Sequence, residues 1–139
     1  DLEGEAECGS IDVEERNVMA RTVTSRADVV VVVGTSGFKG IHGLVRTVDH
    51  LRDHGVAPGR TLMVVNRAPK SPKARAELTR GLADLVAGGA GDAGPTGPVH
   101  VPDRRGLDEI LRDGGRLPQA VAEPVARAVV ETHGRSRFF

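Results

Sequence analysis

A cluster of cations surrounds the expected start of a helix in the stretch "NRAPKSPKAR": Arg67, Lys70, Lys73 and Arg75. We expect the helix to begin at Ser71 or Pro72, because serine caps helices and proline fits their first turn. Cations at this end oppose the helix dipole unless an anion lies among them. The pattern therefore indicates either an anionic partner (a nucleotide phosphate, nucleic acid or the chain's own acidic segment) or a solvated surface.

Asn66 opens the same stretch with a carboxamide, which donates and accepts hydrogen bonds and so suits the edge of a nucleotide base. Three such polar segments each follow a predicted strand: residues 34–40, 66–75 and 102–106. Ligands of parallel α/β sheets bind beyond the carboxyl ends of the strands. We therefore expect one binding site where these three segments meet.

The segment "GTSGFKG" contains glycines that can expose backbone N–H groups to an anion. It does not follow the P-loop pattern, because Lys39 precedes Gly40 and Ile41 stands where a hydroxyl is needed. A glycine-rich loop without a ligand is an equally good interpretation. We predict no catalytic residue and no metal site: Leu51 replaces the glutamate of an HExxH motif between His50 and His54.

The net charge of zero conceals a strong asymmetry. Residues 1–15 contain seven carboxylates and no cation, so the remaining 124 residues carry a net charge of +7. The acidic segment 1–12 is expected either to cover a basic site or to be a disordered, solvated end. With one cysteine and no apolar run long enough to span a membrane, we expect a cytoplasmic protein without disulfides.

The chain is long enough for one domain, and its elements alternate. We predict strands at 28–34, 61–65 and 99–102, and a flexible loop at 88–98. Helices are expected at 13–26, 41–55, from 71 or 72, at 104–115 and from about 118. The expected core positions are Ile41, Leu44, Val45, Val48, Leu51, Leu78, Leu82, Leu85, Val86, Val121, Val125, Val129 and Val130. This order predicts a partial Rossmann-like α/β domain, with a mainly parallel sheet of about three strands flanked by helices.

The first predicted strand, "ADVVVVVG", lacks polar alternation, which predicts burial on both faces. It is too apolar for an exposed edge strand. We therefore expect further N-terminal strands, or a second copy of the chain, to lie beside it. A homodimer and a fragment of a larger nucleotide-binding domain are both consistent with this pattern.

Several stretches together resemble the C-terminal half of MinD/ParA-like P-loop ATPases of the actinobacterial type: "NVMARTVTSRADVVVVVGTSGFKGIHGLVRTVDHL", "TLMVVNRAP" and "VHVPDRRGLDEILRDGGRLP". The matching positions are Asp28, then Asn66 and Arg67, then Pro102 and Asp103. The resemblance implies that Asn66 contacts adenine and that Pro102 and Asp103 border the base. Arg67 follows this asparagine in the family's Asn-Arg pair.

The resemblance covers roughly residues 12–132 and includes no phosphate-binding loop. It implies ATP or ADP as cofactor, with Mg²⁺, only if an N-terminal half is supplied. Either Asp1 or Asp12 would occupy the position of the switch acid. Two hypotheses follow: the base-binding half of an ATPase that acts in ATP-gated positioning or partitioning without hydrolysing ATP alone, or a non-catalytic interaction module that dimerises through a strand edge.

Overall fold

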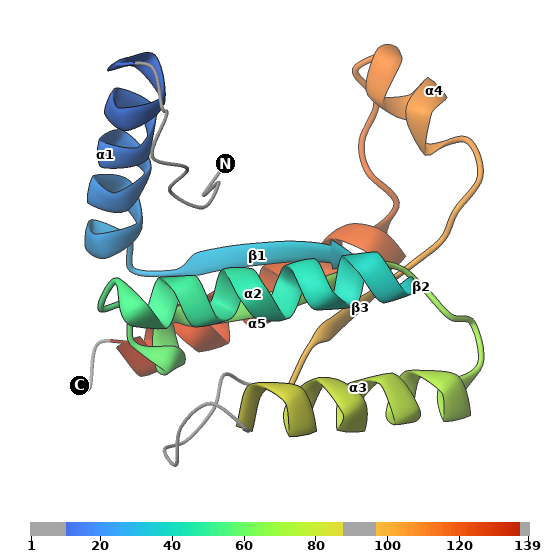
Figure 1. Ribbon diagram of the computed structural model, residues 1–139. Coiled ribbons are helices and arrows are strands. Elements are labelled where there is room, and N and C mark those ends of the chain that lie inside the picture. Colours follow the sequence, from blue (N-terminus) through green and yellow to red (C-terminus); the bar gives the residue numbers. More distant parts are fainter. Residues whose placement is uncertain (1–10, 88–96, 137–139) are drawn as a thin grey trace.

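The computed structural model describes residues 11–87 and 97–136. Its elements are α1 (Ile11–Arg26), β1 (Val30–Thr35), α2 (Phe38–Asp53), the 3-10 turn η1 (Pro58–Arg60), β2 (Thr61–Ala68), α3 (Pro72–Ala87), β3 (Val99–Pro102), α4 (Leu107–Arg112) and α5 (Gln119–Ser136). The strands form one parallel sheet in the order β1-β2-β3, with helices on both faces (Figure 1). The predicted α/β class is confirmed. None of the described helices is long and apolar enough to cross a membrane.

Some predictions concern residues outside the described ranges. They are the disorder of the acidic segment over residues 1–10, the flexibility of residues 88–96, and the choice between Asp1 and Asp12 as the switch acid. Residues 97 and 98 lie in the described chain just before β3.

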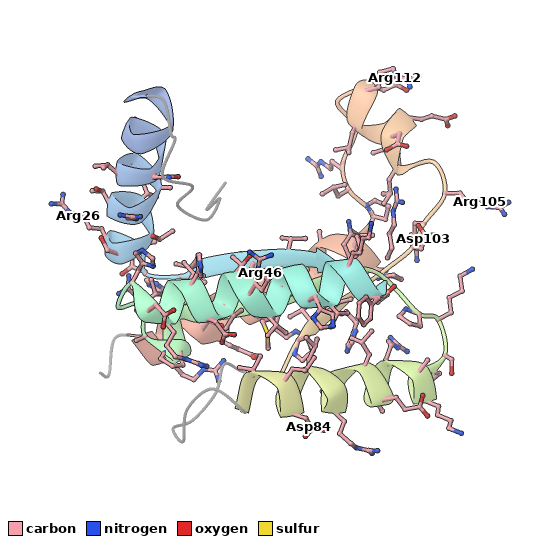
Figure 2. All side chains as sticks on the ribbon, viewed as in Figure 1. Arg26, Arg46, Asp84, Asp103, Arg105 and Arg112 are labelled. Atoms are coloured by element: carbon pink, nitrogen blue, oxygen red, sulfur yellow. The ribbon has the colours of Figure 1, made fainter. Side chains whose placement is uncertain are left out.

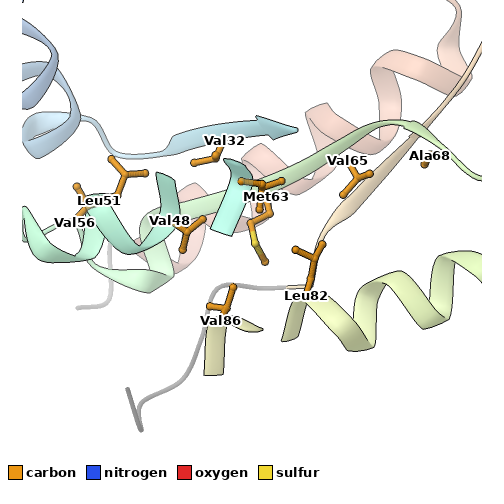
Figure 3. Close-up of a cluster of buried hydrophobic side chains, with 10 residues drawn as sticks. Val32, Val48, Leu51, Val56, Met63, Val65, Ala68, Leu82 and Val86 are labelled. Carbon is orange, nitrogen blue, oxygen red and sulfur yellow. The ribbon is translucent and has the colours of Figure 1, made fainter. Parts of the chain in front are cut away.

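The main core lies between the sheet and the two helices α2 and α3 (Figure 3). Alternate strand residues point to opposite faces, so Val32, Met63 and Val65 face these helices. Their partners on the helices include Leu44, Val48, Leu51, Leu82 and Val86. Ile41, Val45 and Leu78 are partly buried against this cluster, as predicted. The prediction for Leu85 is wrong, since this side chain is 46% exposed.

A second, smaller core lies on the opposite face of the sheet, under α5. Leu62, Val64 and Val101 are buried there. The predicted α5 residues Val121, Val125 and Val129 pack against them. The prediction that Val130 belongs to the core is wrong, because its side chain projects away from the sheet and is exposed.

β1 is an edge strand, and the prediction that both its faces are buried is wrong. Its register pairs every residue from Val30 to Thr35 with β2 on one side. α2 covers one face, but α5 packs over β2 and β3. Val31 and Val33, on the face away from α2, are therefore 42% and 62% exposed. An apolar sequence makes burial of a strand favourable, but its side chains are buried only where another element covers them.

α1 extends from the start of β1 toward the free side of the sheet (Figure 1). The guanidinium of Arg60 donates hydrogen bonds to the carbonyl oxygens of Thr24, Ser25 and Ala27, at the C-terminal end of this helix. Such carbonyls have no partner within the helix, and a cation also complements the helix dipole there. Arg60 thus anchors α1, although the helix exposes three large apolar side chains: Val18, Met19 and Val23.

The ends of several elements differ from the predictions. α4 is shorter than residues 104–115, because Gly106 and Gly114 on either side of it have positive φ angles of 78° and 64°. β2 continues to Ala68 instead of ending at residue 65. Gly55 ends α2 as predicted, with φ of 80° and an N–H that donates to the Arg52 carbonyl oxygen at 2.9 Å.

Candidate functional site

The three polar segments do converge at the carboxyl edge of the sheet. Thr35 at the end of β1 pairs with Asn66 of β2, and Ala68 pairs with Pro102 at the end of β3. All three strands are parallel, so their carboxyl ends form one edge. The sheet order places β2 in the middle, so Asn66 lies next to the loop after β1, whereas Pro102 lies on the opposite side of β2.

An irregularity in β2 shapes this edge. Between Val65 and Ala68 the pairing with β3 shifts by one residue, as in a β-bulge. Within it, Arg67 has φ of 53°, and it is the one non-glycine residue of the described chain with positive φ. Bulges redirect side chains, and strained backbone often accompanies functional sites. The bulge explains why both Asn66 and Arg67 are exposed after five consecutive buried residues.

Two hydrogen bonds stabilise this strained segment. The Arg67 backbone N–H donates to Oδ1 of Asn66 at 2.8 Å. The Ser36 hydroxyl, in the loop after β1, donates to the Arg67 carbonyl oxygen at 2.9 Å. The first bond fixes the Asn66 carboxamide with its two N–H donors and one oxygen lone pair still available. The carboxamide is therefore oriented before any ligand arrives.

A groove of about 410 Å³ lies between the end of β1 and the first half of α2. Its lining residues are Val33, Gly34, Thr35, Gly40, Gly43, Leu44, Thr47 and Asn66. None of these residues is charged. The lining residues are therefore apolar or neutral and polar, a combination that suits a neutral, partly polar group more than a phosphate.

The glycines of "GTSGFKG" serve close packing between β1 and α2. A methyl group on Gly40 would lie 2.5 Å from the Thr35 carbonyl oxygen. One on Gly34 would lie 2.9 Å from the Gly40 carbonyl oxygen. A methyl group on Gly43, by contrast, would meet open space. The structure thus gives Gly34 and Gly40 a packing role that needs no anion, while Gly43 keeps the groove wide.

Of the four predicted base-site residues, only Asn66 lines the groove. Arg67 is exposed beside it, and Pro102 is half-buried in β3. Asp103 is exposed directly after β3, on the side where α4 stands (Figure 2). Sequence reasoning missed the contribution of α2. The signal for it is the spacing of small residues at positions 40, 43 and 47, which places them on one helix face.

The cationic cluster divides into two parts. Lys70 and Lys73 are exposed, and the helix begins as predicted, with Ser71 Oγ accepting from the Ala74 N–H at 3.4 Å. Arg75 is half-buried and lies close enough to His100 on β3 to affect its charge. Burial lowers the pKa of His100, and the positive charge of Arg75 lowers it further. The hydroxyl of Thr79 lies 2.9 Å from Nε2 of this histidine.

His50 and His54 lie one turn apart at the end of α2, with their ring centroids 6.1 Å apart. Nδ1 of His54 lies 2.7 Å from the His50 carbonyl oxygen. Among residues 11–87 and 97–136, no three His, Cys, Asp or Glu side chains are grouped so that they could hold a metal ion.

Fold and groove define a three-stranded parallel α/β domain with a groove that no charged residue lines, at the carboxyl edge of its sheet. Comparison with known proteins found no match to this chain, whether among family models, curated proteins or solved structures. The fold class is established by the structure itself, and the resemblance to MinD/ParA-like ATPases stays a prediction.

Proposed function

We propose that this chain forms the adenine-binding half of a nucleotide site of the MinD/ParA-like type, which acts in ATP-gated positioning or partitioning. Asn66 contacts the base edge, and the walls of the groove enclose its faces. The observation that carries this proposal is the placement of Asn66, which lines the groove and whose Oδ1 accepts a hydrogen bond from the Arg67 N–H.

Three features of the groove support a base in particular. Its volume lies within the range of about 300–1,000 Å³ that is typical of small-molecule sites. Leu44 of α2 provides apolar surface for an aromatic ring. Since no lining residue is charged, the phosphates of ATP or ADP, and any Mg²⁺, would need groups supplied from elsewhere. Arg67 and Asp103 stand beside the groove rather than in it, at the same edge of the sheet.

Titration with adenosine, which carries no phosphate, tests the base site directly. We expect weak binding, with a Kd on the order of 1 mM, about −4 kcal/mol, because the groove is open on one side. Amide NMR signals of Thr35, Gly43 and Asn66 should shift on binding. Asn66→Ala should weaken binding about tenfold, the equivalent of one lost hydrogen-bonding group.

Asn17→Ala is the matched control, because it removes the other asparagine of the chain, on α1, which does not line the groove. It should leave adenosine binding unchanged. The proposal fails if adenosine causes no shift at the groove, or if Asn66→Ala binds as well as the wild type. ATP hydrolysis at an ordinary enzymatic rate by the 139-residue chain would contradict it as well.

A further inference from the structure

The first half of α3 is less firmly packed on the sheet than the second half. The two buried side chains of this helix, Leu82 and Val86, both lie in its second half. Between Pro72 and Thr79 no side chain is buried, and Leu78 is only partly so. Segments with few buried apolar contacts open locally at a lower free energy than the core. A single polar contact in this half therefore has a large influence on whether it stays attached.

One such contact joins α3 to β3. The Thr79 hydroxyl lies 2.9 Å from Nε2 of His100. His100 is half-buried, on the face of β3 opposite to that of Val101, which packs under α5. The other ring nitrogen of His100, Nδ1, is buried and has no hydrogen-bond partner among the described residues. The imidazole therefore contacts α3 through one nitrogen, while a proton on the other nitrogen would have no acceptor.

This arrangement suits a neutral imidazole and opposes an imidazolium. A neutral histidine has one N–H and one lone pair, so the Thr79 hydroxyl can pair with Nε2 in either tautomer, by accepting or by donating. An imidazolium has a proton on both nitrogens, and its Nδ1–H would be a buried donor without an acceptor, which is costly. The positive charge of Arg75 on α3 acts in the same direction. Met63 and Val65 of β2, on the same face of the sheet, carry no charge that could offset it.

We propose that protonation of His100 releases the first half of α3 from the sheet while the rest of the domain stays folded. Opening gives both ring nitrogens access to water and separates the imidazolium from Arg75. Leu82 and Val86 hold the second half of α3 in the core, so the opening ends near Thr79. The released turns carry the cationic start of the helix. This pH-sensitive opening does not depend on adenine binding.

The direction of the pH effect follows from the two states of His100. In the closed state its pKa is lowered, by burial and then by Arg75. In the open state the ring is in water, where the pKa of histidine is about 6.5. The open state therefore binds the proton more readily, and opening is favoured as the pH is lowered below about 6.5. Between pH 7.5 and 5.5, proton uptake by a solvated histidine can favour opening by at most about tenfold.

Amide hydrogen exchange, followed by NMR, tests the proposal. It gives a protection factor for each amide, from which the intrinsic effect of pH on exchange has been removed. At both pH 7.5 and pH 5.5, the amides of Arg75 and Thr79 should be protected at least about tenfold less than those of Val48 in α2 and Val64 in β2, because they open locally. From the higher pH to the lower, the protection of Arg75 and Thr79 should fall about three- to tenfold.

Two variants assign the pH effect to one histidine. His100→Gln keeps a polar side chain that does not titrate, so the protection of Arg75 should change less than about twofold between the two pH values. His42→Gln, at an exposed position of α2, is the matched control and should keep the wild-type change. Equal protection of Arg75 and Val64 would show that α3 opens only with the whole domain, and would overturn the proposal. A wild type without the pH effect, or the same effect in His100→Gln, would overturn it too.

Discussion

The hydroxyl of Ser36 donates a hydrogen bond to the carbonyl oxygen of Arg67, 31 residues further along the chain, at 2.9 Å. This bond joins the loop after β1 to the bulge of β2. It therefore connects the two segments that form the ends of the groove, and it stabilises the positive φ of Arg67.

Replacing Ser36 by alanine should lower the free energy of unfolding by about 0.5–1.5 kcal/mol, the usual contribution of one such bond. Chemical denaturation measures this change. Ser25→Ala is the control, because the Ser25 hydroxyl bonds only to the Thr22 carbonyl oxygen within α1. Alanine is well tolerated in a helix, so this control should be neutral or slightly stabilising. Equal effects of the two substitutions would contradict the role of Ser36.

Two glycines of α2 should respond in opposite ways to alanine. Gly40→Ala places a methyl group against the backbone of Thr35, and should cost about 1–3 kcal/mol of stability through overpacking. Gly43→Ala meets open space, and should add about 0.5–1 kcal/mol, because glycine disfavours helix interiors. Since Gly43 lines the groove, this stabilised variant should also bind adenosine more weakly. Thermal unfolding and NMR titration check the two effects separately.

The stability of the fold should depend far more on Leu82 of α3 than on Leu85 of the same helix. Leu82 is 1% exposed, while Leu85 on the same helix is 46% exposed. Leu82→Ala should therefore cost about 2–5 kcal/mol, the range for a fully buried leucine. Leu85→Ala should cost at most about 1 kcal/mol, because much of its apolar surface already contacts water. Urea titrations of the two variants measure the difference, and similar midpoints would contradict the assigned packing.

The free energy of unfolding should decrease as the pH is lowered through the range where histidines titrate. The pKa of His100 is lowered in the folded state, by burial and then by Arg75. Below about pH 6.5, the usual pKa of histidine, the unfolded chain binds a proton more readily than the folded chain. As the pH is lowered from about 6.5, the folded state therefore loses stability until the pH passes the lowered pKa of His100. Above about pH 6.5, the contribution of His100 to the free energy of unfolding is constant.

His100→Gln should make the free energy of unfolding less dependent on pH between about 6.5 and 5, where histidine rather than carboxylate titration dominates. His42→Gln, at an exposed position of α2, is the control and should keep the wild-type dependence. Denaturant titrations at several pH values supply the measurement. The same slope for wild type and His100→Gln would refute this assignment.

Thr132 should be replaceable by valine with a gain in stability. Its side chain is 1% exposed, and its hydroxyl has no hydrogen-bond partner among the described residues. A buried hydroxyl without a partner costs free energy, so Thr132→Val should raise the free energy of unfolding by about 1 kcal/mol. Thr22→Val, at an exposed position of α1, should change it by less than about 0.5 kcal/mol. A loss of stability in Thr132→Val would show that the hydroxyl has a partner.

Local patterns in the sequence are sufficient to predict the elements and their order. Leu44, Val48 and Leu51 recur at helical spacing, and β-branched runs between turns indicate strands. Ser71 and Gly55 mark helix ends, because capping depends on residues close in sequence. The same reasoning predicts that Asn66 lies at the carboxyl edge of the sheet, since this follows from parallel strands alone.

Tertiary structure alone decided which surfaces are covered. Val31 and Val33 belong to a run that reads as buried, yet no described element covers that face of β1. Leu85 and Val130 fit the apolar spacing of their helices but point past the sheet. The groove likewise depends on how α2 packs against the end of β1, and it includes Asn66 of β2. The hydropathy of a side chain is a local property, whereas its burial depends on segments that are distant in sequence. The sequence therefore predicted the elements, and only their packing defined the groove and the exposed edge of the sheet.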